Sequence, residues 1–280
     1  MKKLMLFLLI LSMACDTGNL TFIADLPNSL REVSGMEYMA STGEIWMHND
    51  GENKPRLYSM DSMGNIKHEL KIDAKNRDWE DIASDPEGNL YIGDFGNNRN
   101  KRENLTILKV SRTLLGSSSN VPVEYISFKY PNQKKFPPRN KKMHFDCEAM
   151  VFHNDSLYLF TKSRVRGNFG RTDLYRVPAK EGQYVATYID TFRTCNDLDC
   201  WVTGADISAD GKQLVVLTPK AAWIFRNYQS GNFFEGDVSM LPFNHVSQKE
   251  SVCFKSDSLL YIADELAHGS GGNLYEFPLN

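Results

Sequence analysis

The chain has 280 residues, of which 41% are hydrophobic and 24% are charged, and its formal net charge is −3. This composition is typical of a soluble globular protein with one large domain or two smaller ones. The small negative charge argues against nucleic acid as the partner, because binding a phosphate backbone needs a clustered excess of Lys and Arg.

The first 15 residues have the pattern of an export signal. Lys2 and Lys3 precede an apolar run over residues 4–11, which is too short to span a membrane, and small residues lead to Cys15. The end resembles a bacterial lipoprotein signal, in which Cys15 becomes the lipidated first residue, although Leu11 lies four positions before the cysteine instead of three. We expect residues 1–15 to be this signal and residues 16–280 to form one domain. The protein is then anchored to a membrane of the bacterial cell envelope; secretion without a lipid is the alternative.

Five similar segments follow along the chain. They begin at Ser34, Glu80, Glu148, Thr203 and Glu250, so their starts are 46, 68, 55 and 47 residues apart. Each start opens a short apolar strand, which leads through a turn such as 85–88 (Asp-Pro-Glu-Gly) to a second apolar strand. A third strand and, in most segments, a more polar fourth strand complete the unit. This is the length of a four-stranded propeller blade with its loops.

The repeats predict an all-β fold, a five-bladed β-propeller. Residues 123–128 and 184–188 are the predicted fourth strands of the second and third units. The last unit has no fourth strand of its own, and we expect residues 20–25 to supply it, which closes the ring and covers both free edges. A six-bladed propeller is the alternative, because the longest unit leaves room for additional structure.

The repeat also brings carboxylates to one mouth of the ring. The start of the first strand and the end of the second strand in a blade are antiparallel neighbours. Glu80 and Asp94 hold these positions in the second unit, and Glu250 and Asp264 hold them in the fifth. In the other units the positions are held by Ser34 and Asn49, Glu148 and Thr161, and Thr203 and Thr218.

Carboxylates this close together repel one another, so they need a cation or bound protons. Oxygen ligands without neighbouring cysteine favour a hard cation such as Ca²⁺. The predicted Ca²⁺ ligands are Glu80, Glu148, Glu250, Asp94 and Asp264. The alternative is that each glutamate caps backbone amides and forms an ion pair with a neighbour such as Arg77.

Three connections expected at the same mouth are basic. Residues 97–104 carry three Lys or Arg against one acid, and residues 131–144 and 162–172 carry five and four with no acid. A basic rim around an acidic centre attracts anions. The candidate ligand-binding residues are Asn49, Arg77, Arg99, Arg164 and Arg166, and the expected partner is an anionic small molecule, a glycan or a protein. Solvated loops without a ligand are the alternative.

Histidines and cysteines complete the set of candidates. His144 and His245 each lie shortly before a repeat glutamate, where either is a candidate general acid or base. Cys195 and Cys200 have the spacing of a small disulfide loop in an exported protein.

The repeat cores are similar to a known family. The shared motifs are Asp-Trp-Glu-Asp-Ile-Ala at 78–83, Tyr-Ile-Gly-Asp-Phe-Gly-Asn-Asn at 91–98, Asp-Cys-Glu-Ala-Met at 146–150, and Val-Thr-Gly-Ala-Asp-Ile at 202–207. They resemble the SdiA-regulated (YjiK-type) bacterial β-propellers and related exported propellers of unassigned function. This resemblance implies a calcium-binding, membrane-tethered propeller and no established reaction. Ser251-Val252 departs from the Gly-Ile that is usual in the family.

The sequence therefore favours a binding protein. We expect a monomeric, envelope-anchored Ca²⁺-binding propeller that recognises an anionic ligand at the channel mouth, because no clear general base accompanies the carboxylates. One alternative is a metal-dependent hydrolase of the phosphoesterase or lactonase type. Another is a propeller in which the ion is purely structural.

Overall fold

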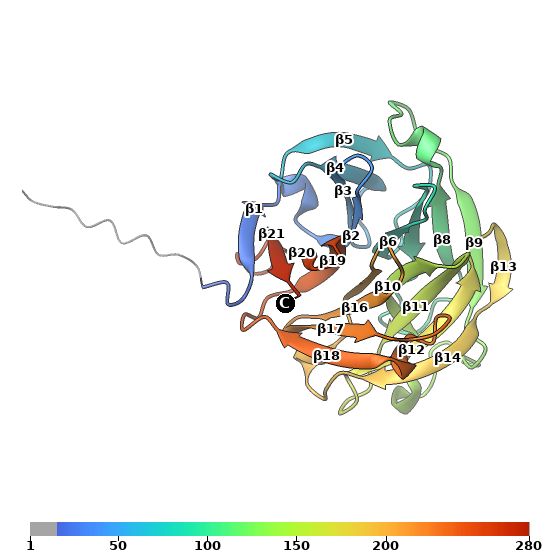
Figure 1. Cartoon of the computed structure of the whole chain (residues 1–280). Coiled ribbons are helices and arrows are strands. Elements are labelled where there is room, and N and C mark those ends of the chain that lie inside the picture. Colours follow the sequence, from blue (N-terminus) through green and yellow to red (C-terminus); the bar gives the residue numbers. More distant parts are fainter. Residues whose placement is uncertain (1–15, 280) are drawn as a thin grey trace, which may run out of the picture.

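The computed structural model describes residues 16–279, which form five small sheets arranged in a ring (Figure 1). The predicted five-bladed β-propeller is confirmed, and the six-bladed alternative is wrong. Cys15 and the rest of the predicted signal lie outside the described residues, so lipidation stays a prediction. No helix of the described part is long and apolar enough to cross a membrane.

Each blade is a sheet whose first strand lies nearest the central channel. The first two blades contain β2 (Val33–Met39), β3 (Glu44–Asn49), β4 (Arg56–Met60) and β5 (Ile66–Lys71), then β6 (Trp79–Ser84), β7 (Leu90–Asp94), β8 (Leu105–Val110) and β9 (Glu124–Lys129). The third and fourth contain β10 (Asp146–His153), β11 (Ser156–Lys162), β12 (Arg171–Pro178) and β14 (Thr187–Arg193), then β15 (Gly204–Ile207), β16 (Gln213–Thr218), β17 (Ala221–Arg226) and β18 (Asp237–Pro242). The fifth contains β19 (Lys249–Ser256), β20 (Leu259–Asp264), β21 (Asn273–Pro278) and β1 (Thr21–Asp25).

Short 3₁₀ turns lie in the connections: η1 (Asn28–Leu30), η2 (Arg112–Leu114), η3 (Asn140–Lys142), η4 (Leu198–Cys200) and η5 (Phe233–Glu235). Most residues of the inner strands are apolar because both faces of these strands are buried; every residue of β7 is buried. The outermost strands are polar, and five of the six residues of β5 are exposed. The hydrophobic core consists of clusters between neighbouring blades, such as Trp46 and Leu57 against Ile82 and Ile92.

The ring closes as predicted. β1 pairs antiparallel with β21, with Thr21 opposite Glu276 and Asp25 opposite Asn273. The N-terminal segment therefore becomes the fourth strand of the last blade and covers the edge of β21.

The predicted fourth strand at 184–188 is divided between two blades, which corrects the prediction for the third unit. β13 (Gly182–Val185) pairs in parallel with β9 of the second blade, and β14 pairs with β12 of the third. Between them Ala186 is buried, and its N–H donates to the carbonyl of Lys129 at 2.9 Å. Alternating polar and apolar residues predict a strand but do not predict which of two adjacent edges it joins.

Polar side chains on the inner strands connect successive blades. The Ser34 hydroxyl donates to the Glu80 carbonyl at 2.7 Å, and the Thr203 hydroxyl donates to the Lys249 carbonyl at 2.6 Å. The Asp81 carboxylate accepts the N–H of Met150 at 2.8 Å in the next blade. These bonds satisfy buried backbone groups at the centre of the ring, where no strand ladder reaches them.

Candidate metal centre

A bulge places each repeat glutamate at the channel mouth. The strand register shifts between Trp79 and Asp81, between Cys147 and Ala149, and between Lys249 and Ser251, so Glu80, Glu148 and Glu250 are the extra residues of their strands. The register shifts in the same way around Ser34. A bulged residue is left out of the regular strand pairing, so its side chain does not follow the alternation of side chains between the two faces of the sheet. Here the bulges direct the repeat glutamates into the channel.

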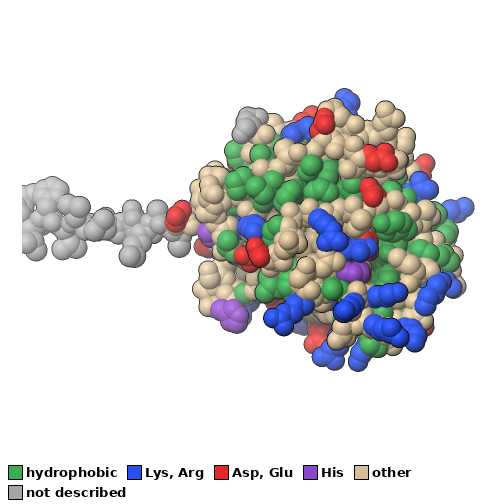
Figure 2. All heavy atoms as spheres, turned by 90° about the horizontal axis from the view of Figure 1, so that it is seen from below, with side chains coloured by type: hydrophobic (Ala, Val, Ile, Leu, Met, Phe, Trp, Pro, Cys, Tyr) green, Lys and Arg blue, Asp and Glu red, His purple; other side chains and the backbone are tan. Residues whose placement is uncertain are grey.

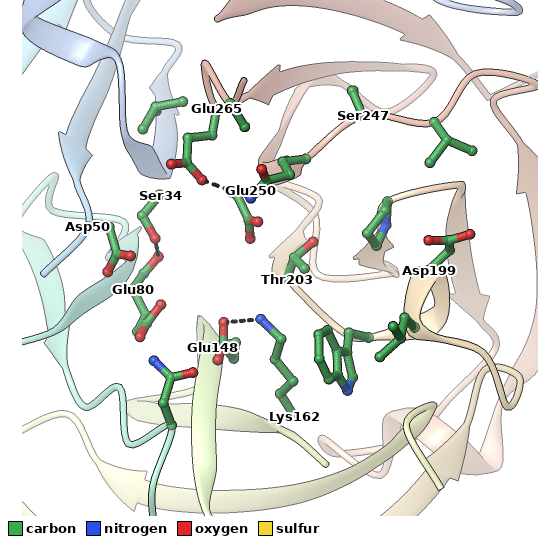
Figure 3. Close-up of a pocket in the computed structure, with 18 of the residues that line it drawn as sticks. Ser34, Asp50, Glu80, Glu148, Lys162, Asp199, Thr203, Ser247, Glu250 and Glu265 are labelled. Atoms are coloured by element: carbon green, nitrogen blue, oxygen red, sulfur yellow. Dashed lines mark hydrogen bonds and ion pairs between the residues drawn. The ribbon is translucent and has the colours of Figure 1, made fainter. Parts of the chain in front are cut away.

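The mouth encloses a cavity of about 590 Å³ into which these side chains point (Figure 3). Ser34, Glu80, Glu148, Thr203 and Glu250 all line it, so the structure brings the five repeat starts together. The lining is strongly acidic: against two basic side chains, Lys162 and Arg164, it holds the carboxylates of Asp50, Glu80, Glu148, Asp199, Glu250 and Glu265.

Glu80 is the carboxylate with the least compensation. It is only 6% exposed, and its side chain has no hydrogen-bond or ion-pair partner among residues 16–279. Carboxylate oxygens of Asp50 and Asp78 lie within 4.8 Å of its own oxygens and of each other. Burial, and then the charges of Glu148 and Asp50, raise the pKa of Glu80 well above its ordinary value. Burial and Asp50 also raise the pKa of Asp78, to about 6.

Two glycines make this approach possible. A Cβ at Gly96 would lie 1.9 Å from Oε1 of Glu80, and a Cβ at Gly51 would lie 2.6 Å from Oδ1 of Asp78. Either contact is far below van der Waals distance, so any other residue would displace a carboxylate.

Glu148 is in a different electrostatic environment. Carboxylate oxygens of Asp146 and Glu80 lie within 4.8 Å of its own oxygens. However, Lys162 donates to Glu148 at 2.9 Å, and Arg164 donates to both Glu148 and Asp146. Burial acts to raise the pKa of Glu148, but Lys162 and Arg164 outweigh it and hold that pKa below the ordinary value. Lys162 and Arg164 also lie over the ring of Trp201, at 5.2 and 4.9 Å from its centroid. This half of the cavity thus carries its own cations.

Glu250 lies across the cavity from Glu80 (Figure 3). Within the described chain its carboxylate has no hydrogen-bond or ion-pair partner. Burial raises its pKa to about 8, with the charge of Lys162 opposing the rise.

The predicted ligands Asp94 and Asp264 do not line the cavity. Asp94 forms ion pairs with Arg77 at 3.1 Å and Arg102 at 2.9 Å, and Asp264 accepts the N–H of Asn273 at 2.8 Å and the hydroxyl of Tyr275 at 3.0 Å. The bulges explain this placement. Asp94 lies opposite Trp79 and Asp264 opposite Lys249, so the repeated spacing reflects strand register and not a shared direction of the side chains.

The predicted ligand-binding residues are spread over several environments. Arg164 lines the cavity, whereas Arg99 and Arg166 are exposed on loops outside it. The amide of Asn49 donates to the Ser29 carbonyl at 2.7 Å and accepts the N–H of Glu32, so it fixes the start of the first blade. Arg77 pairs with Asp94 and not with a repeat glutamate.

Neither candidate histidine lines the cavity. His144 is buried, and its Nδ1 lies 3.0 Å from the Ser163 hydroxyl; burial lowers its pKa. His245 lies in a separate, largely apolar pocket, with Nδ1 3.2 Å from Nζ of Lys249. His268 is the histidine that lines the central cavity.

Sequence reasoning missed Asp50, Asp78 and Asp146. A signal for two of them was present, because Asp-x-Glu occurs at 78–80 and again at 146–148. The bulge at the glutamate brings the residue two positions earlier to the same mouth, which regular strand alternation does not predict. Asp50 directly follows β3, and only the tertiary structure shows that it meets the second blade.

The connection from β14 to β15 forms another wall. Cys195 and Cys200 are joined by a disulfide, and Leu198, Asp199 and Trp201 beside it line the cavity. The bond closes a short loop and so restricts the positions of these three side chains.

No protein-family model matches the chain, and no curated protein matches it at a significant level. Solved structures do. A gluconolactonase from Xanthomonas campestris superposes with a TM-score of 0.52 at 12% identity, covering 96% of this chain and 93% of that one. A protein of unknown function from Bacteroides thetaiotaomicron gives 0.51 at 9% identity, covering 93% and 75%. The PQQ-bound aldose sugar dehydrogenase of Streptomyces coelicolor gives 0.50 at 10% identity, covering 92% and 97%. At these identities the likeness shows the propeller fold alone.

Proposed function

We propose that the central cavity binds one divalent cation, Ca²⁺, at Asp50, Asp78 and Glu80, and that the bound cation holds an anionic group of a small ligand. The observation that carries the proposal is the Glu80 carboxylate, which is buried, unpaired and close to two further carboxylates. A buried charge without a partner is costly, and a metal ion removes that cost.

The chemistry of the ligands favours Ca²⁺. All three side chains offer carboxylate oxygens, and none of the three is a histidine or cysteine that would favour zinc or copper. Asp50 lies on a loop, and Ca²⁺ accepts the irregular geometry that a loop ligand gives, whereas Mg²⁺ requires a near-octahedral site. Because Lys162 and Arg164 already form ion pairs with Glu148 and Asp146, we expect one ion and not two.

The cavity leaves space for a ligand beside the ion. Its volume of about 590 Å³ is that of a small-molecule site. Three protein carboxylates leave coordination positions open for ligand oxygens. Asn98 and Arg164 line the same mouth and offer hydrogen-bond donors to a carboxylate or phosphate.

Calorimetric titration with Ca²⁺ tests the cation site. We expect Glu80→Gln to weaken Ca²⁺ binding by about 100-fold or more, because the substitution removes the central ligand charge. Glu124→Gln, on the exposed face of β9, is the control and retains wild-type affinity. Equal Ca²⁺ binding by wild type and Glu80→Gln contradicts the proposal.

One observation favours a metal-dependent hydrolase as the second candidate. Glu250 is unpaired, lies across the cavity from the proposed ion and has its pKa raised to about 8 by burial, which are the properties of a general acid or base near neutral pH. If the protein is a hydrolase, it turns over a lactone or phosphate ester with Ca²⁺, and Glu250→Gln abolishes turnover while Ca²⁺ affinity is retained. Turnover at background rates for both substrate classes would contradict the hydrolase and favour the binding protein.

An ion that is purely structural would stabilise the fold and leave the affinity for every anionic ligand unchanged.

A further inference from the structure

Three basic loops on the side of the second and third blades are joined by buried side chains. The Asn97 amide donates to the Phe145 carbonyl at 3.1 Å, and the Asn100 side-chain carbonyl accepts the Phe145 N–H at 2.9 Å. The Gln133 amide donates to the Asn100 carbonyl at 3.0 Å. Asn97, Asn100 and Gln133 are all buried. The β7–β8 loop is therefore fixed to the long β9–β10 connection.

The third loop is attached to the same connection. The N–H of Arg164, in the β11–β12 loop, donates to the Met143 carbonyl at 2.9 Å, and Ser163 lies 3.0 Å from Nδ1 of His144. Long connections without regular structure are usually functional or disordered, and here the buried polar contacts favour function. The three loops form one preorganised surface.

This surface carries unpaired positive charge. The acid in these three loops is Glu103 alone, in the first. Eight basic side chains are exposed and form no ion pair within residues 16–279: Arg99, Lys101, Lys134, Lys135, Arg139, Lys141, Lys142 and Arg166. We name these eight residues the basic platform. The edge-on view of the ring shows Lys and Arg side chains gathered toward one margin (Figure 2).

The platform is continuous with the central cavity. Asn98 and Arg164 belong to the first and third of these loops, and both line the cavity. A linear ligand lying on the platform can therefore extend to the mouth, whereas a flat bilayer surface cannot reach carboxylates as recessed as Glu80.

We propose that the basic platform binds a linear acidic polysaccharide. Its carboxylate or sulfate groups match the charge of the platform. The exposed ring of Phe136, 37% accessible between Lys135 and Arg139, offers an apolar surface for a sugar's C–H groups. The hydroxyl groups of a sugar donate to carboxylates such as Glu250 and Glu265 in the cavity. Binding to the platform stands independently of the cation; the extension of the chain into the cavity rests on the proposed function.

Titration with polygalacturonate tests the platform. The experiment uses the full chain in EDTA, because the polymer itself binds Ca²⁺. We expect the combined variant Lys134→Ser, Lys135→Ser, Lys141→Ser and Lys142→Ser to bind the polymer at least about tenfold more weakly than the wild type. We also expect wild-type binding to weaken as salt is added. The matched control replaces four exposed lysines outside the three loops, at Lys67, Lys71, Lys180 and Lys212, and retains wild-type affinity.

Three outcomes overturn the proposal: no binding of polygalacturonate above that of neutral dextran, equal loss in the control variant, or platform-dependent binding to phosphatidylglycerol vesicles without binding to the polymer. Failure of the cation site is distinguishable. Glu80→Gln loses Ca²⁺ binding and keeps polymer binding in EDTA, whereas the platform variant loses polymer binding and keeps Ca²⁺ binding.

Discussion

Glu80 and Glu148 both begin a repeat and both occupy a bulge, yet their surroundings differ. Lys162 and Arg164 form ion pairs with Glu148, whereas the groups beside Glu80 are the carboxylates of Asp50 and Asp78 and, on its other side, those of Asp146 and Glu148. The negative charge of Glu148 is therefore paired with positive charges inside the protein. Around Glu80, like charges crowd a buried site, and only protons or a cation relieve the repulsion. The local partners, more than the repeat, decide which glutamate is available to a metal.

Gly96→Ala tests this geometry at a single residue. The new Cβ would lie 1.9 Å from Oε1 of Glu80, so the carboxylate must move, and we expect Ca²⁺ affinity to fall about tenfold or more. Gly116→Ala is the control, because nothing lies within 4 Å of its Cβ position. Calorimetry on both variants is the measurement. A wild-type affinity in Gly96→Ala would mean that Glu80 does not bind the ion.

Closure of the ring depends on one short element. β1 supplies the outer strand of the fifth blade, and Leu20 beside it packs into the core between the fourth and fifth blades. Ile23 packs into the core between the fifth and first blades. β13 has a related role between the second and third blades, where it adds a parallel strand to its neighbour's edge. Both elements cover an edge that would otherwise be open to pairing with another chain.

Removal of β1 tests the contribution of closure. We compare a chain that begins at residue 26 with one that begins at residue 16. The shorter chain loses a complete ladder and two packed side chains, so we expect its melting temperature to be lower by about 10 °C or more. Thermal unfolding followed by circular dichroism, with light scattering for aggregation, measures the effect. Equal melting temperatures would show that the three remaining strands suffice.

Carboxylates with raised pKa values are not confined to the cavity. Beyond the cavity, burial and the charge of Asp206 raise the pKa of Glu37 well above its ordinary value. Burial raises the pKa of Asp81 and, to about 7, that of Asp206. Together with Glu80 and Glu250 these groups make the folded state hold protons that the unfolded chain releases at lower pH. The stability of the molecule is therefore linked to both pH and cations.

The sign of this linkage gives a prediction for the whole protein. A carboxyl group whose pKa is raised by folding stabilises the fold at low pH, and that stabilisation is lost as pH rises from the unfolded value near 4 toward about 8, the pKa of Glu250. In EDTA we expect the free energy of unfolding to fall by about 2 kcal/mol or more between pH 5 and pH 8. Urea unfolding at each pH measures it.

Ca²⁺ should reverse much of this loss at pH 8, because it binds the ionised carboxylates of the folded state. At pH 5 protons compete with the ion, so its stabilising effect should be smaller. Stability in EDTA that stays constant or rises between pH 5 and pH 8 would contradict the assignment of raised pKa values to the channel carboxylates.

By itself, the sequence determined the blade repeat, the number of blades, the strand that closes the ring and the three glutamates at one mouth. These follow from local patterns, because strand periodicity, turn residues and the spacing of repeats act within each unit. Only the tertiary structure decided the direction of each side chain. A bulge turns Glu80 into the channel and leaves Asp94 opposite Trp79, where it pairs with Arg77 and Arg102. Lys162 and Arg164 of its own blade pair with Glu148, whereas Glu80 meets Asp50 from the neighbouring blade, and the energy of a buried charge depends on such partners more than on its own strand.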